Sequence, residues 1–275
     1  MVIYHATLTS KVELISKKYY KFIQIIRKPS LTICYRKSIF SFIIGANNFY
    51  AIESYPFEGY YFFMDFKDCR IVYMGTPEIS ASVLERLILD GFNIVALVSQ
   101  PDRPVGRKRE ILPTPTKKVA LKYNIPVYQK EKIKLDYDFL NSIKPDLILT
   151  LAFGQIVPQG LLDIPKLGCL NLHGSLLPKY RGAAPIQYAL INNETETGMS
   201  LMQMTKVMDA GKVYAANSIN IEEDDNSTSL FVKMADLAYK LAKEYIPLYV
   251  EGKLSGVDQD ESLVTFAPTI KKEEE

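Results

Sequence analysis

Short apolar segments alternate with helical patterns from residue 70 onward, and this alternation constrains the fold more than any other feature. Four short segments are mostly apolar: 70–74 (RIVYM), 94–98 (IVALV), 146–152 (DLILTLA) and 169–173 (CLNLH). Strands of this kind are buried on both faces, as in a parallel sheet. Amphipathic helical patterns separate or follow them, near 79–88, 116–123, 131–143 and 226–245. The sequence therefore predicts an α/β fold with an open, mostly parallel, Rossmann-like sheet and helices on both faces.

The turn after the first of these strands decides whether a dinucleotide binds there. It reads GTPEIS (75–80), with one glycine where the dinucleotide-binding fingerprint requires several. Thr76 lies where a helix N-cap is expected, Pro77 at the first helical position, and Gly91 where the helix ends. We therefore expect a helix directly after this turn and no NAD or FAD at it.

Residues 1–63 differ in composition from the rest of the chain. They hold 15 of the 31 aromatic residues, and eight Lys or Arg against three Asp or Glu. Three interpretations are open: a membrane anchor, an organellar targeting segment, or translated upstream sequence before a true start at Met64. The longest uncharged stretch, 38–52, is shorter than a membrane span of about 18 residues, and targeting segments are rich in Arg and Ser rather than aromatic residues. We therefore expect an atypical extension over 1–63, a start at Met64, and a folded domain over 64–275.

The numbers of charged residues, cysteines and histidines exclude several kinds of site in that domain. The 275 residues include 33 basic and 31 acidic ones, so the net charge of +2 gives no sign of a broad nucleic-acid-binding surface. Cys34, Cys69 and Cys169 are too few for a disulfide scaffold and have no CxxC spacing. Only two histidines are present, His5 and His173. We therefore expect no metal site, since zinc enzymes use several histidines or cysteines.

The fourth strand pattern ends in polar residues at the sheet edge where parallel α/β folds bind ligands. Asn171 and His173 are two residues apart, so their side chains lie on one face of the strand. Each alone is more often a packing or turn residue. Together they can donate two hydrogen bonds to a developing oxyanion, and a loop rich in Gly and Pro follows them. A separate turn, VMDAGK (207–212), presents Asp209, which ordinary turn chemistry also explains.

Several separated motifs indicate a family. The runs NLHGSLLPKYRGAAPIQ (171–187) and GMSLMQMTKVMDAGKVY (198–214) closely resemble methionyl-tRNA formyltransferases, as do MGTPE (74–78) and SQPDRPVGRKREILPTPTK (99–117). The resemblance extends from about residue 65 to residue 274. It implies the formyltransferase fold, with a catalytic domain over 64–275. Other enzymes that use the same formyl donor share parts of these motifs, so the reaction class is better defined than the acceptor.

The resemblance implies transfer of a formyl group from the co-substrate 10-formyltetrahydrofolate to the α-amine of methionyl-tRNA. Asn171 matches the family's oxyanion donor, and His173 a second donor. Asp209 matches the carboxylate that orients the imidazole and relays protons. Direct transfer needs no serine or cysteine nucleophile. Cys169 shares the strand face of Asn171, and we interpret it as a core thiol.

A loop directly after His173 matches the family's tetrahydrofolate-binding loop. It consists of Ser175, Leu176, Leu177 and Pro178. A fixed loop of this kind can offer backbone donors and acceptors to the amide edge of a pterin. The two leucines can equally well anchor the loop to the core.

A basic segment over 101–110 (PDRPVGRKRE) bears on the acceptor. By composition it fits a solvated turn, whereas the resemblance implies contact with the tRNA acceptor end, with Arg107 at the matching position. Cations there can meet several phosphates and raise affinity in a salt-dependent way. The candidate tRNA-binding residues are Arg103, Arg107, Lys108 and Arg109.

Family members continue past LVTFAPTIKKEE (263–274) into a second, β-barrel-like domain that binds tRNA, whereas this sequence stops at Glu275. We therefore expect a catalytic site with much of the tRNA-binding surface absent. Alternatives are formyl transfer to a sugar or small amine, hydrolysis of 10-formyltetrahydrofolate, and a truncated folate-binding remnant. We expect a monomer in the cytoplasm without membrane contact, or a mitochondrial or plastid matrix protein if 1–63 is a transit segment.

Overall fold

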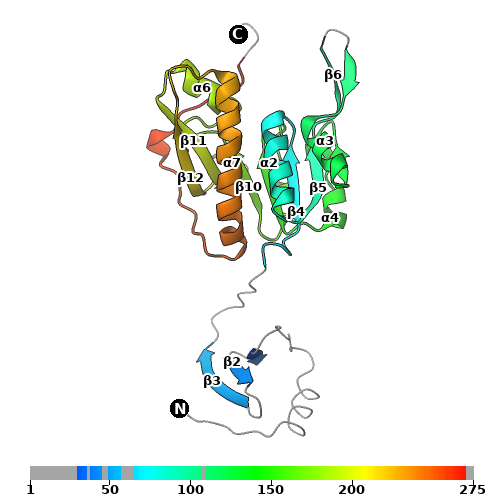
Figure 1. The fold of residues 1–275 in the computed structure, drawn as a ribbon, viewed down its shortest axis with the longest axis vertical. Coiled ribbons are helices and arrows are strands. Elements are labelled where there is room, and N and C mark those ends of the chain that lie inside the picture. The colour runs from blue at the N-terminus through cyan, green and yellow to red at the C-terminus, as the bar shows by residue number, and fades with distance from the viewer. Residues whose placement is uncertain (1–29, 36–37, 45–48, 57–64, 107–108, 271–275) are drawn as a thin grey trace. The chain divides into compact units, whose positions relative to one another are not determined.

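The computed structural model describes residues 30–35, 38–44, 49–56, 65–106 and 109–270 (Figure 1). The chain divides into two compact units, Met1–Phe62 and Phe63–Glu275. In the first unit, three strands pair antiparallel in sequence order: β1 (Ser30–Tyr35), β2 (Ser38–Ile44) and β3 (Phe49–Pro56). The irregular hydrophobic pattern of this segment predicts no strand, but its β-branched and aromatic residues favour extended backbone by composition. Met64 lies outside the described residues, and a start there stays a prediction.

The second unit is built on a seven-stranded sheet of order β12-β11-β10-β9-β4-β5-β8. The neighbours from β10 to β8 are parallel, and β11 is antiparallel to both of its neighbours. The strands are β4 (Ile71–Gly75), β5 (Ile94–Ser99), β8 (Val127–Gln129), β9 (Leu147–Leu151), β10 (Cys169–His173), β11 (Glu196–Gln203) and β12 (Val213–Asn220). The four predicted strands are β4, β5, β9 and β10, and the predicted mostly parallel α/β sheet is confirmed.

Helices cover both faces of this sheet (Figure 1). The core on one face holds residues of α2 (Glu78–Leu89), α3 (Pro115–Lys122), α6 (Pro185–Ile191) and α7 (Ser227–Val250). The core on the other face holds residues of η1 (Ile133–Leu135), α4 (Phe139–Ile143) and α5 (Gln159–Leu162). Within β4, Ile71 and Tyr73 belong to the first core, whereas Val72 and Met74 belong to the second. Because both faces are buried, the strand has no polar alternation.

The helix α2 begins one residue later than predicted. Its N-cap is Pro77, which makes no side-chain capping bond. The Thr76 hydroxyl instead donates to the carbonyl oxygen of Phe153 and accepts from the amide of Gln100. The predicted capping role of Thr76 is therefore wrong, because its hydroxyl joins the segments that follow β9 and β5. Gly91, at φ +83°, follows the C-cap, as predicted.

The predicted helix over 131–143 is interrupted. Only η1 and α4 are helical there, and Asp136, at the end of η1, leaves helical geometry. The amide of Ile133 donates to Oε1 of Gln155, and Asp136 pairs with Lys130, so neighbouring groups bind this segment. The helical spacing of apolar residues over 131–143 therefore corresponds to two short helices, η1 and α4, that bury residues in the same core.

The long helix α7 begins where the sequence predicts. Asn226 is its N-cap and forms a capping box with Ser229. Pro247 lies inside the helix, which nevertheless continues to Val250. Among the residues that the structure describes, no helix is both long and apolar enough to span a membrane.

Candidate active site

The strand β10 carries Asn171 and His173 toward its carboxyl end. Asn171 lies opposite Thr150 of β9 and Met202 of β11, and His173 lies opposite Ser200. Residues opposite one another on paired strands present their side chains to the same face of the sheet. The Thr150 hydroxyl is buried and has no hydrogen-bond partner in the described part of the chain. This end of the sheet therefore presents polar groups on a face that is otherwise apolar core.

The imidazole of His173 is buried, with 5% of its surface exposed. Its Nε2 lies 2.8 Å from the carbonyl oxygen of Tyr180, and its Nδ1 lies 3.7 Å from Oδ2 of Asp209. A carbonyl oxygen only accepts, so Nε2 must carry a proton and donate it. At 3.7 Å, Nδ1 makes no direct hydrogen bond with the carboxylate. Nδ1 and the carboxylate therefore remain available to a group that enters beside them.

Asp209 comes from the turn between β11 and β12, far from His173 in the sequence. Its backbone is in the left-handed region, at φ +52°, where an aspartate is tolerated better than most residues. The side chain is 13% exposed, and its Oδ2 accepts a 2.8 Å hydrogen bond from the amide of Gly182. The structure thus brings an imidazole and a carboxylate together at the edge where Asn171 lies.

The loop after His173 is held by one hydrogen bond within it and one to β11. The Ser175 hydroxyl donates to the carbonyl oxygen of Lys179 at 2.6 Å, and the amide of Leu177 donates to the Ser200 hydroxyl at 3.1 Å. Ser175 is buried, and Leu176 and Leu177 are half-buried. The bond between Leu177 and Pro178 is cis. The predicted contact of this loop with a folate stays a prediction.

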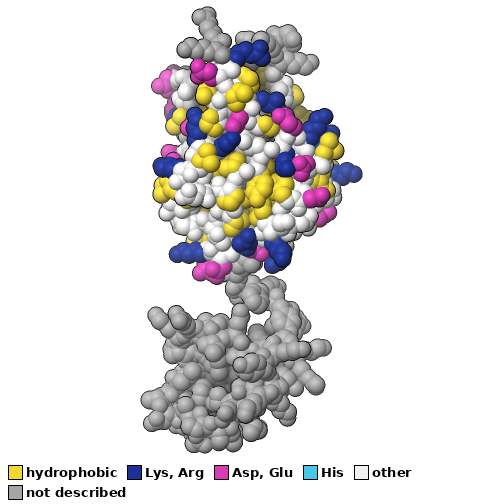
Figure 2. Space-filling view, turned by 90° about the vertical axis from the view of Figure 1, so that its right-hand side faces the viewer, with side chains coloured by type: hydrophobic (Ala, Val, Ile, Leu, Met, Phe, Trp, Pro, Cys, Tyr) yellow, Lys and Arg dark blue, Asp and Glu magenta, His cyan; other side chains and the backbone are white. Residues whose placement is uncertain are grey.

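The basic segment forms a two-stranded hairpin, β6 (Arg103–Val105) and β7 (Glu110–Leu112), which projects from the second unit (Figure 1). Arg103 is exposed and pairs with Glu131 at 2.8 Å. Arg109 is exposed at φ +51°, whereas Arg107 and Lys108 lie outside the described residues. Figure 2 shows basic side chains interspersed with acidic ones around a hydrophobic area, rather than gathered into one basic surface, on the face it presents.

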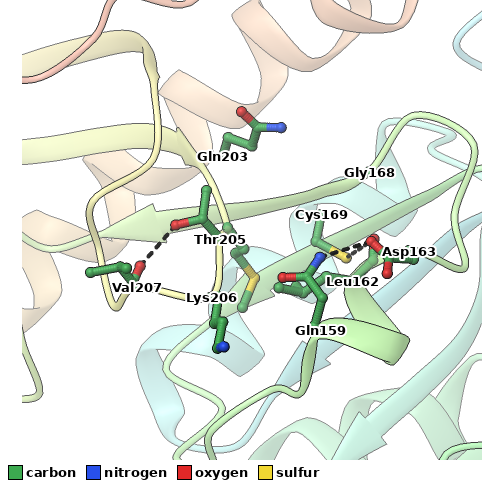
Figure 3. A pocket seen from close by; sticks show the side chains of 10 residues that line it. Gln159, Leu162, Asp163, Gly168, Cys169, Gln203, Thr205, Lys206 and Val207 are labelled. Carbon is green, nitrogen blue, oxygen red and sulfur yellow. Dashed lines mark hydrogen bonds between the residues drawn. The ribbon is translucent and has the colours of Figure 1, made fainter.

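A cavity of about 410 Å³ lies beside the turn that carries Asp209 (Figure 3). Its walls come from α5, the start of β10 and the end of β11 with the turn beyond: Gln159, Leu162, Asp163, Gly168, Cys169, Gln203, Met204, Thr205, Lys206 and Val207. Cys169 precedes Asn171 by two residues, so the cavity lies on the strand face that Asn171 shares, about 7 Å along the strand. No sequence motif predicts this cavity, because three separated segments form it.

The Cys169 thiol in this cavity is in an environment that favours its protonated form. Burial, and then the charge of Asp163, raise its pKa to about 12. Its sulfur lies 3.8 Å from the carbonyl oxygen of Leu162. The thiol is therefore protonated at neutral pH, which agrees with its interpretation as a core thiol.

The available groups suit acyl transfer without a covalent intermediate. A carboxamide can donate to a developing oxyanion, an imidazole can donate and accept, and a carboxylate can take a proton. The cavity falls within the usual range of small-molecule sites, about 300 to 1,000 Å³. Among described residues, no group of three or more His, Cys, Asp or Glu could hold a metal ion.

Comparison with known families identifies the family of this chain. The model of the formyl transferase family matches residues 69–246, which include both β10 and the turn of Asp209. The chain belongs to the formyl transferase family.

Curated relatives of the chain indicate one branch of this family. The chain is 48% identical over 208 residues to a methionyl-tRNA formyltransferase of Staphylococcus epidermidis, covering 75% of this chain and 67% of that protein. It is 50% identical over 208 residues to one of Halalkalibacterium halodurans, covering 75% and 66%. The resemblance to methionyl-tRNA formyltransferases is thereby confirmed. The chain spans about two thirds of the length of these relatives.

Solved structures show the same fold at much lower identity. An N-formyltransferase from Helicobacter canadensis has a TM-score of 0.58 at 19% identity, over 75% of this chain and 72% of that one. A phosphoribosylglycinamide formyltransferase from Bacillus halodurans has a TM-score of 0.54 at 19% identity, over 66% and 94%. At this identity the likeness concerns the fold alone.

Proposed function

We propose that this chain transfers the formyl group of 10-formyltetrahydrofolate to the α-amine of methionyl-tRNA. The observation that carries the proposal is the approach of His173 to Asp209 beside Asn171, in a chain 48–50% identical to methionyl-tRNA formyltransferases. The names of those relatives supply the acceptor, and the family supplies the reaction class. We further propose that the protein acts as a monomer in the cytoplasm.

In the proposed reaction the amine attacks the formyl carbon, and a carbon–nitrogen bond forms. The carbonyl oxygen becomes an oxyanion, to which the Asn171 carboxamide and Nδ1 of a protonated His173 donate hydrogen bonds. Nε2 stays bonded to the carbonyl of Tyr180 and holds the ring in place. Asp209 takes the amine proton, and Nδ1 of His173 gives its proton to N10 as the bond between N10 and the formyl carbon breaks. Asp209 then returns its proton to Nδ1, so both side chains regain their starting forms. The products are formylmethionyl-tRNA and tetrahydrofolate, with no net change in protons.

We assign the cavity beside Asp209 to the pterin part of the co-substrate. It shares the β10 face of Asn171, so a ring bound there can extend its N10 substituent toward the carboxamide. The loop 175–178 follows the opposite, carboxyl end of β10, where hydrogen bonds of Ser175 and Leu177 hold it. Substituting Met204, which lines the cavity, by Trp is expected to raise the KM for 10-formyltetrahydrofolate by reducing its volume.

We assign the acceptor end of the tRNA to the β6–β7 hairpin. The hairpin carries the exposed residues Arg103 and Arg109, and Arg107 and Lys108 occupy the sequence between its strands. The hairpin projects from the second unit (Figure 1), so a large substrate can reach it from solvent. Phosphate contacts of this kind weaken as salt is raised.

The proposal is tested by mixing the purified chain with 10-formyltetrahydrofolate, alone and with charged initiator tRNA. Transfer of formyl to the methionyl ester, detected by mass spectrometry after deacylation, is the expected result. Loss of the formyl group without an acceptor would instead indicate a hydrolase. Formylation of amino sugars but not of methionyl-tRNA would indicate a different acceptor. Binding of the folate with no reaction would leave only a binding remnant, and each of these results would overturn the proposal.

A further inference from the structure

A segment near the carboxyl end of the described chain reaches back to the turn of Asp209. The carboxamide nitrogen of Gln259 donates to the carbonyl oxygens of Asp209 and Gly211, at 2.8 and 2.7 Å. Both of its hydrogens are therefore used on one turn. The two bonds hold the backbone on either side of Ala210, and so fix the direction in which the Asp209 side chain leaves the turn.

The other end of the same carboxamide is held by a buried cation. Oε1 of Gln259 accepts from Nε and Nη2 of Arg181, at 3.0 and 2.9 Å. The guanidinium also forms two bonds with the exposed carboxylate of Glu261. Arg181 is 5% exposed, and a planar guanidinium that makes four such bonds has little freedom to rotate. Gln259 is thus clamped between a fixed donor and the turn.

Arg181 lies between the two residues that contact the site. The carbonyl of Tyr180 accepts from Nε2 of His173, and the amide of Gly182 donates to Oδ2 of Asp209. The backbone of Arg181 itself is paired on both sides with the carboxyl-terminal segment, through Thr265 and Ala267. Three consecutive residues therefore hold the imidazole, the carboxamide of Gln259 and the carboxylate.

We propose that Gln259, held by Arg181, is a positioning residue that sets the location of the Asp209 carboxylate relative to His173. This rests on the proposed function, because Asp209 is given its proton-transfer role there. Gln259 contacts only backbone of the Asp209 turn, so it acts through Asp209. Nothing in the sequence pattern marks it, since it is one polar residue in an irregular segment.

The test compares two variants of the full chain that separate the bonds of Gln259. Gln259→Leu removes all of these hydrogen bonds and keeps a side chain of similar size. Gln259→Glu keeps an acceptor for Arg181 but faces the two carbonyls of the turn with an oxygen. Both are expected to lower kcat for formyl transfer to methionyl-tRNA by about 10- to 100-fold, as for misplaced catalytic groups, with little change in the KM for 10-formyltetrahydrofolate.

A double-mutant cycle separates positioning from general stability. If Gln259 acts through Asp209, Gln259→Leu costs nothing further in an Asp209→Ala background. Asp260→Ala is the matched control, because it removes the cap of η2 (Glu261–Leu263) one residue away and touches neither Arg181 nor the Asp209 turn. The control is expected to keep the kcat of the starting protein. An equal loss in Asp260→Ala, or a full loss from Gln259→Leu in the Asp209→Ala background, would overturn the proposal.

The Gly182 amide provides a readout that does not depend on activity. Its hydrogen bond to Asp209 is expected to slow its exchange with solvent in the starting protein and in Asp260→Ala. In both Gln259 variants exchange is expected to be faster, while circular dichroism shows retained folding. If the starting protein transfers no formyl group, the proposed function fails, and this exchange still decides the role of Gln259. Unchanged exchange in both variants would overturn the positioning role.

Discussion

The amide of Gly182 donates a 2.8 Å hydrogen bond to the carboxylate of Asp209, although 27 residues separate the two in sequence. Gly182 has φ +127°, and a Cβ there would lie 2.5 Å from the carbonyl oxygen of Ala267. The position therefore requires glycine for both its backbone angle and its space. The residue that anchors the carboxylate is thus held by the carboxyl-terminal segment.

Gly182→Ala is expected to destabilise the fold by about 1–3 kcal/mol, as strained backbone does. It should also lower kcat, because the amide can no longer reach Asp209. Urea unfolding and formyl transfer measure the two effects. Gly252→Ala is the control: Gly252 also has positive φ, but no atom lies within 4 Å of the added Cβ. A variant of Gly182 with unchanged kcat would show that the amide does not place the carboxylate.

Asn171→Ala is expected to lower kcat by about 10² to 10³, the usual cost of removing one oxyanion donor. The KM values should change little, because the donor acts mainly as negative charge develops. Steady-state kinetics of formyl transfer provide the measurement. Asn220→Ala, at the exposed end of β12, serves as the matched control. Turnover that survives the loss of Asn171 would remove this residue from the mechanism.

Arg107→Glu is expected to raise the KM for methionyl-tRNA sharply and to leave folate binding intact. The reason is the reversal of a charge that is proposed to meet phosphates, and the effect should shrink as salt is raised. Lys240→Glu, an exposed position on α7, makes the same charge change elsewhere. Equal losses for tRNA and folate would point to damage of the fold rather than to lost tRNA contact.

Asp225 at the start of α7 is expected to stabilise the fold in a pH-dependent way. Hydrogen bonds from Lys233 and then Ser229 lower the pKa of its carboxyl from 3.8 to about 2. A lowered folded-state pKa means that the ionised form favours folding. Its contribution is therefore full above about pH 4 and is lost as the pH falls toward 2.

The check is the difference in unfolding free energy between the starting protein and Asp225→Asn, measured by urea at several pH values. This difference should be largest near neutral pH and vanish toward pH 2. Asp224→Asn, the exposed neighbour, controls for the change in net charge. A difference that stays constant with pH would contradict the assignment.

Sequence patterns predicted the centre of the fold well and its edges poorly. The strands β4, β5, β9 and β10 are buried on both faces, so their apolar runs are unambiguous. The hairpin β6–β7 and the edge strand β12 mix polar and apolar residues, because part of each is exposed to solvent. Their sequences therefore lack the continuous apolar run that marks a buried strand. Thr76 shows the same limit, since its capping role was displaced by contacts with segments far along the chain.

Part of the candidate site could also be predicted from the sequence, and part could not. Asn171 and His173 lie on one strand, so their common face follows from spacing alone. The approach of Asp209 depends on Gly182 and on Gln259, which local patterns do not connect to it. The cavity beside Cys169 arises only when α5, β10 and the turn after β11 meet.

The most direct test of the account is the single-turnover rate of formyl transfer from 10-formyltetrahydrofolate to methionyl-tRNA in Asp209→Asn. The asparagine keeps an oxygen for the Gly182 amide but cannot accept the amine proton. The account predicts a fall of about 10² to 10⁴ relative to the starting protein, with Asp258→Asn, an exposed carboxylate nearby, unchanged. A rate equal to that of the starting protein would contradict the role of the His173–Asp209 pair.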